Sequence, residues 1–187
     1  MKPYLFFALL LALTATACQS DQQNKTLVAP PPPSPDQLGA DYFLPILGLD
    51  KRYKDLGVLE MIKVAQRPVR PGTVINGEAQ FPVYQVFDEN NQVLANIFYN
   101  QNGELEIPFF VEIVSSTITT PEGIKVGDTY ARLIDTYGDL PTTGSEIEGW
   151  THAYLGLVQF RMDAYNPQVQ NPTINPEDEI LAIGFFF

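Results

Sequence analysis

The stretch from Thr117 to Gly138 (TITTPEGIKVGDTYARLIDTYG) most constrains the fold, because a brief extended piece, a tight turn and a capped helix can be read continuously in it. Four apolar residues have the spacing of one helical face, namely Tyr130, Leu133, Ile134 and Tyr137. Asp128 is the predicted N-cap, since its carboxylate can accept from free amides of the first turn. The predicted turn and cap positions are Gly123, Gly127, Asp128 and Gly138. The stretch predicts a short amphipathic helix.

The clearest strand signals lie upstream of this helix. The segments 81–88 and 93–99 are rich in Val, Phe and Tyr and are separated by four polar residues, which predicts a hairpin. Asn102-Gly103 then leads into 105–113, and Asn-Gly between strands is a strong hairpin signal because both residues tolerate positive φ. Three antiparallel strands are therefore expected in succession.

The third of these strands alternates with a period of two. One side is apolar: Leu105, Ile107, Phe109, Val111 and Ile113. The other side is Glu104, Glu106, Pro108, Phe110 and Glu112. The pattern is typical of a strand with one buried face, and Pro108 favours a sheet edge or a bulge. The three glutamates are expected to form a solvated acidic face.

The remaining elements are less regular. We expect a packed irregular segment at 42–49, one helical turn at 50–56, a strand at 58–64 ended by the Pro and Gly residues of 67–72, and a strand at 150–164. The last segment, 180–187 (ILAIGFFF), is expected to pair inside the sheet, because an exposed apolar strand promotes aggregation. The predicted fold class is α+β, a mainly antiparallel β-sheet with one principal helix, in a single domain over 41–187.

The first 17 residues have the pattern of an export signal. A basic start at Lys2 precedes the apolar run 4–13, which is too short to span a bilayer, and small residues follow at 15–17. The single cysteine of the chain, Cys18, comes directly after them. This arrangement resembles the lipobox of bacterial lipoproteins, although Ala15 stands where that family usually has Leu.

Two outcomes are open for Cys18. Cleavage by the lipoprotein signal peptidase would give a diacylglyceryl-modified Cys18, which we favour because an unpaired exported thiol needs an explanation. Cleavage at Ala-Thr-Ala by the ordinary signal peptidase would leave a free N-terminal thiol. The lipidation hypothesis makes 18–40, with its Pro-rich part, a tether between membrane and domain.

The charge balance limits the partners. Without Lys2 the chain keeps 10 basic residues against 22 acidic ones, a net charge of −12, which argues against nucleic acid or an anionic lipid surface. A lone cysteine also leaves the exported domain without an internal disulfide, so its stability must come from the core.

The sequence from Val114 onward resembles the RpoE-regulated lipoprotein family of unknown function. The residues that carry this resemblance are Ser116, Ile118, Thr120, Gly123-Ile124, Val126-Gly127, Leu133 to Gly138 and Val158-Gln159-Phe160. The match covers about 70 residues and is structural in character. It implies an envelope protein with an antiparallel sheet and one helix laid on it, and it implies no catalytic residues.

Residues with catalytic potential lack suitable partners in the sequence. His152 is the only histidine, so a zinc site or a His-based catalytic group has little support. Ser115 and Ser116 have no recognisable base. Paired carboxylates among Glu104, Glu106 and Glu112 are the residue type of a glycosidase, but an outer strand face explains them better. We predict no enzyme activity, no cofactor and no metal site; a calcium ion at Asn175, Glu177, Asp178 and Glu179 is a remote alternative.

Aromatic side chains offer a possible binding surface. Tyr84, Phe98 and Phe110 are expected on a sheet face opposite the core, where such residues hold ligands in many proteins unless a second layer covers them. The leading hypothesis is a non-enzymatic envelope lipoprotein with a binding or structural role, contacting another envelope protein or a cell-wall component. The alternative is a module that binds sugar, peptide or lipid on this face; an envelope hydrolase is the weakest. Gln19 in place of Asp after Cys18 favours the outer membrane, on the periplasmic side.

Overall fold

A computed structural model describes residues 38–187, apart from 77–78, 146–149, 166–169 and 171. Eight strands form one antiparallel sheet in the order β1-β2-β3-β4-β8-β7-β6-β5. Their bounds are β1 Val69–Asn76, β2 Ala79–Phe87, β3 Val93–Asn102, β4 Leu105–Ile113, β5 Thr142–Gly144, β6 Trp150–Leu155, β7 Val158–Tyr165 and β8 Ile180–Phe186. The predicted α+β class with a dominant antiparallel sheet is confirmed.

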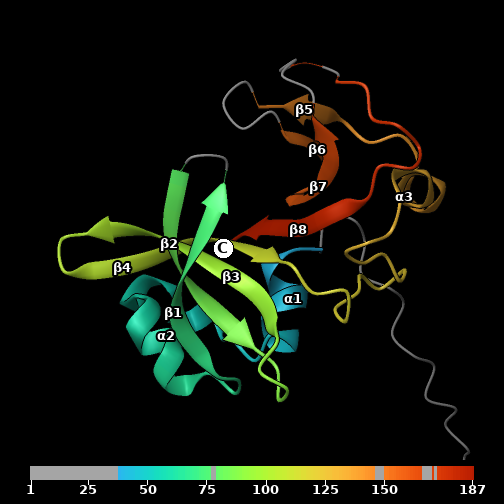
Figure 1. The fold of residues 1–187 in the computed structure, drawn as a ribbon. Coiled ribbons are helices and arrows are strands. Elements are labelled where there is room, and N and C mark those ends of the chain that lie inside the picture. The colour runs from blue at the N-terminus through green and yellow to red at the C-terminus, as the bar shows by residue number, and fades with distance from the viewer. Residues whose placement is uncertain (1–37, 77–78, 146–149, 166–169, 171) are drawn as a thin grey trace, which may run out of the picture. The chain divides into compact units, whose positions relative to one another are not determined.

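Helices pack on one face of the sheet, which we call the core face (Figure 1). They are α1 (Ala40–Ile46), the 3-10 helix η2 (Lys51–Leu56), α2 (Val58–Val64) and α3 (Tyr130–Tyr137). The ring of Phe43 from α1 stacks on that of Phe185 from β8, with 5.2 Å between centroids. Tyr137 of α3 packs near Phe160 of β7 at 6.2 Å. The helices α1 and α3 therefore cover the neighbouring central strands β8 and β7 on the same side of the sheet.

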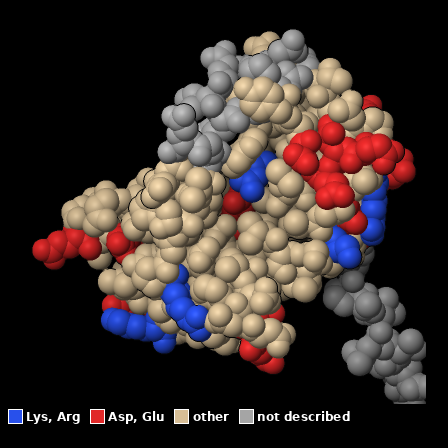
Figure 2. All heavy atoms as spheres, viewed as in Figure 1, with Lys and Arg blue, Asp and Glu red and all other residues tan. Residues whose placement is uncertain are grey.

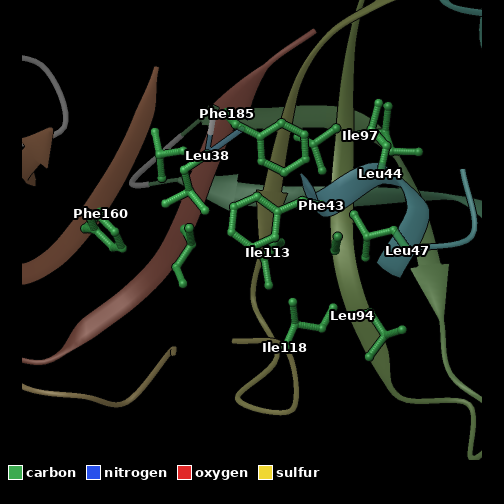
Figure 3. Packing of buried hydrophobic residues seen from close by; sticks show 14 of the residues in the cluster. Leu38, Phe43, Leu44, Leu47, Leu94, Ile97, Ile113, Ile118, Phe160 and Phe185 are labelled. Carbon is green, nitrogen blue, oxygen red and sulfur yellow. The ribbon is translucent and has the colours of Figure 1, made fainter. Parts of the chain in front are cut away.

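The core is continuous from β2 to β7. Alternate residues on each strand point into it, as the pleat requires, and Figure 3 shows Phe43, Phe185 and Ile113 meeting between α1 and the sheet. Fully buried members include Leu47, Ile97, Ile113, Leu133, Phe160 and Phe185. Burial of this apolar area is the main stabilising term in a domain of this kind.

Two expected strands differ from the structure. The segment 58–64 is the helix α2, because Val58 and Met61, three residues apart, both turn into the core. The segment 150–164 is a hairpin of β6 and β7, since Gly156 adopts φ 59° and reverses the chain between Leu155 and Val158. The segment 42–49, expected to be irregular, is helical up to Ile46 as part of α1. The strand β1 runs through Pro71 and Gly72, because an edge strand tolerates a missing N–H.

A bulge in β4 changes which residues face the core. Phe98 pairs with Phe110 while Tyr99 pairs with Pro108, so Phe109 is an extra residue without a partner on β3. The alternation predicted for the whole strand holds only beyond this point, where Val111 and Ile113 are buried. Before it, Pro108 is buried and Phe109 is exposed.

Candidate functional site

The sheet face opposite the helices carries two parallel rows of side chains. The polar row follows the strand register through Gln85, Asn96, Glu112, Gly184 and Gln159. The aromatic row lies two residues along each strand and follows Val83, Phe98, Phe110 and Phe186. No helix of the described chain packs on these rows, and we call this surface the open face (Figure 1).

A buried ion pair joins Glu112 of the polar row to Arg161, which lies beside that row on β7. Arg161, two residues from Gln159 on β7, donates from its guanidinium to Glu112 on β4, with 2.8 Å between the nitrogen and Oε1. The side chains of Glu112 and Arg161 are 7% and 14% exposed. Figure 2 shows basic and acidic atoms recessed among uncharged atoms in the middle of the view, with a larger acidic cluster further to the right. The charges of the open face are thus paired below its surface.

Burial controls the electrostatics of this pair. It raises the pKa of Glu112 above the usual value of 4.5, although Arg161 and the Asn96 amide act in the opposite direction. It also lowers the pKa of Arg161. The guanidinium stacks on Trp150 at 4.0 Å from the ring centroid, a favourable arrangement for a desolvated cation.

The pair leaves two buried polar atoms without a hydrogen-bond partner among the described residues. They are the acceptor Glu112 Oε2 and the donor Arg161 Nε. Buried polar groups are normally satisfied, so each such atom calls for an explanation. Asn96 accepts from Gln85 Nε2 at 3.1 Å through Oδ1, and its side chain also hydrogen-bonds Glu112, but this bond leaves Oε2 without a partner.

The three predicted face aromatics do not lie together. Phe98 and Phe110 share the open face, with 5.8 Å between ring centroids, and Phe186 continues the row at 5.0 Å from Phe110. Tyr84 lies on the core face, where it is buried and donates to Glu106 Oε2 at 2.5 Å. Placing Tyr84 on the binding surface was wrong, because its register partner is the buried Ile97.

The expected acidic face is also corrected. The bulge at Phe109 puts Glu106 on the side of Tyr84 and Glu112 on the opposite side of the sheet. Glu112 is buried and paired instead of solvated, and only Glu104, at the hairpin turn, is exposed as expected. Glu106 and Glu112 therefore do not form the facing carboxylate pair of a glycosidase.

One of the two predicted caps of α3 is wrong, namely the N-cap. The N-cap is Thr129, whose Oγ1 accepts from Arg132 N at 3.4 Å. Asp128 was predicted for this role, but its buried carboxylate accepts from Lys125 N at 2.9 Å and from the Arg132 guanidinium at 2.7 Å. Gly138 ends the helix with φ 78°, and the turn glycines Gly123 and Gly127 have φ 87° and 89°.

The other residues considered for catalysis or metal binding lie in turns or strands, where their contacts are with neighbouring side chains and backbone. Ser115 Oγ lies 2.9 Å from Thr117 Oγ1, within a turn. His152 is half-buried on β6, with its ring 6.3 Å from that of Tyr154. Asp178 accepts from Asn175 N at 2.7 Å, an arrangement that stabilises the local turn. Within the described ranges, no group of three or more His, Cys, Asp or Glu side chains is placed to hold a metal ion.

Two features of the leader lie outside the described residues. Cys18 and the apolar run before it are among residues 1–37. In the part of the chain that is described, no helix has both the length and the apolar character needed to cross a membrane.

Sequence reasoning overlooked Phe186, Gln159 and Arg161 as residues of one surface. Alternation along β7 separates Gln159 and Arg161 from the buried Val158, Phe160 and Met162, so that signal was available. The order β4-β8-β7, which brings Arg161 within reach of Glu112, requires the sheet topology.

The described domain belongs to the α+β class, with an eight-stranded antiparallel sheet covered by helices on one face. No protein-family model matches the chain, and no curated protein matches it. Among solved structures it is similar to the uncharacterized protein yfeY from Escherichia coli, with 12% sequence identity and a TM-score of 0.45. That similarity covers 68% of this chain and 87% of the other.

Proposed function

We propose that this chain is a bacterial envelope lipoprotein that is anchored through Cys18 and binds a partner on its open face without transforming it. The observation that carries the binding role is the aromatic row. Phe98, Phe110 and Phe186 form connected ring contacts on a face that the described helices leave uncovered. Exposed aromatic groups next to recessed polar groups are typical of binding surfaces.

The anchor is supported by the sequence alone. An apolar run of export-signal length, small residues at 15–17 and the lone cysteine at 18 form one arrangement. Gln19 supports the outer membrane, with the domain on the periplasmic side, and the acidic charge supports a partner other than nucleic acid. The partner class is a cell-wall component or another envelope protein.

The anchor is tested by metabolic labelling with palmitate. The wild type should carry label and Cys18→Ser should not, while Gln19→Asp should keep the label and move the protein to the inner membrane. An unlabelled wild type rules out the lipoprotein assignment.

The binding role is tested by placing a photo-crosslinking amino acid at single positions in the full chain. Position 186 on the open face should give a defined adduct in intact envelopes. Position 59 is the matched control, because Leu59 is 57% exposed on α2, which packs on the other side of the sheet. Equal adducts at both positions, or none at 186, would contradict a binding role for the open face.

A further inference from the structure

The two rows of the open face differ in chemistry and lie side by side. Register places the aromatic residues Phe98, Phe110 and Phe186 two residues away from Asn96, Glu112 and Gly184 of the polar row, on the same three strands. Two residues along a strand correspond to roughly 6.6 Å. A ligand lying on the aromatic row would therefore reach the polar row with groups at its edge.

The two rows come into contact at Gly184. A Cβ at this position would lie 2.3 Å from Cζ of Phe110 and 2.9 Å from Cγ of Gln159. The absence of a side chain therefore lets the Phe110 ring lean across the polar row, next to Glu112. An apolar surface and hydrogen-bonding groups are thus combined within one small patch.

The unsatisfied atoms define what the ligand must offer. Glu112 Oε2 needs a donor, and Arg161 Nε needs an acceptor. A hydroxyl group supplies both, since it donates one hydrogen and accepts on its lone pairs. Leaving buried polar atoms unpaired is costly, and more so for charged groups, so a ligand that satisfies them gains affinity.

The charge balance of the patch favours an uncharged ligand. Glu112 and Arg161 neutralise each other, and the other members of both rows are amides, aromatic residues, Val83 and Gly184. The whole chain carries a net charge of −11, which repels anions at longer range. An acyl chain would match the rings but would leave both polar atoms unsatisfied.

We propose that the open face binds a neutral saccharide, with a sugar ring packed against Phe110 and Phe186 and its hydroxyls directed to Glu112, Arg161 and Gln159. A pyranose combines an apolar C–H face with a rim of hydroxyls, which matches an aromatic row beside a polar row. Both unsatisfied atoms are shielded in the free protein, so binding requires a side chain to move. Phe110 is the ring that lies across the polar row at Gly184, and its movement would open that row.

Trp150 provides a direct reporter, because it is the only tryptophan and its ring lies under the Arg161 guanidinium. The full chain, held in a detergent without a sugar head group, is titrated separately with cellohexaose, maltohexaose and the hexamer of N-acetylglucosamine. At least one hexamer should give a saturable change in Trp150 emission, and calorimetry should give the same dissociation constant.

Variants separate binding from folding. Phe186→Ala and Gln159→Ala should each weaken binding at least tenfold with an unchanged far-ultraviolet circular dichroism spectrum. Leu59→Ala, which removes an exposed apolar side chain from α2 on the other side of the sheet, should change the dissociation constant less than twofold. Equal binding by all three variants would overturn the assignment.

The inference rests on the proposed binding role, and the two can fail separately. If none of the three hexamers binds at millimolar concentration while position 186 still gives a specific adduct, the saccharide assignment is wrong and the binding role stands. If palmitate binds with Trp150 quenching and the sugars do not, the ligand is apolar and the inference is wrong. If no hexamer binds and position 186 gives no adduct, both proposals are wrong.

Discussion

The carboxyl group of Glu112 is buried, and burial disfavours its charged form. Its carboxylate is on the open face, yet burial exceeds the combined stabilisation from Arg161 and Asn96, so its pKa is raised. Removing either charge of a buried pair leaves the other uncompensated, whereas the intact pair is itself a weak source of stability. The pair therefore makes better sense as a feature of the surface it occupies than as a contribution to folding.

The raised pKa gives a signed pH dependence. The unfolded state ionises Glu112 near 4.5, below the folded pKa, so folding stability from this group is fully present below 4.5 and is lost as pH rises through the folded value. Glu112→Gln cannot titrate. The difference in unfolding free energy, wild type minus variant, should therefore decrease as pH rises from 4.5.

Urea unfolding of both proteins from pH 4 to pH 8 measures this difference. Other titrating groups are common to the two proteins and cancel to the extent that the substitution leaves them undisturbed. A difference that increases with pH would mean that the attraction to Arg161 outweighs burial.

At the element scale, α3 depends on its N-terminal cap. Thr129→Ala removes the Oγ1 acceptor for Arg132 N and should lower the unfolding free energy by about 0.5–2 kcal/mol. Thr136→Ala is the matched control in the same helix: its hydroxyl donates to Arg132 O, a bond that adds little to a helix, so the expected change is smaller. Chemical denaturation compares them, and equal losses would show that Thr129 is no cap.

The sequence predicted those elements whose burial pattern is local. The hairpins at 79–102 and 93–113 and the helix 130–137 follow from alternation, from Asn102-Gly103 and from one apolar stripe. The segment 58–64 was assigned to the wrong class because its β-branched residues favour a strand, while Val58 and Met61 at helical spacing decided the packing.

The candidate site was less predictable for a physical reason. The bulge at Phe109 reverses the alternation within β4, and nothing in a period of two indicates where an extra residue enters. Pro108 indicated an edge or a bulge without placing the reversal. The pairing of Glu112 with Arg161 also requires β8 to lie between β4 and β7, which is a property of the topology.

On the scale of the whole molecule, one strand contact unites the sheet. The strands β1 to β4 and the strands β5 to β8 meet only where 110–113 of β4 pairs with 183–186 of β8, among the described residues. Phe185 of this segment is fully buried and stacks on Phe43, so the same residues also attach α1. The polar row crosses this junction at Gly184.

Deletion of residues 184–187 should therefore abolish soluble folding. Loss of one buried Phe costs about 3–5 kcal/mol, and the truncation also removes three of the four register pairs at the junction, against a total of about 5–15 kcal/mol for a typical domain. Deletion of Phe187 alone is the control: it removes a half-buried ring and the bond from its N–H to Phe109 O, so the protein should stay folded with a lower melting temperature. Soluble yield and thermal unfolding followed by circular dichroism measure both. A four-residue truncation that melts like the wild type would show that the two halves hold together without this junction.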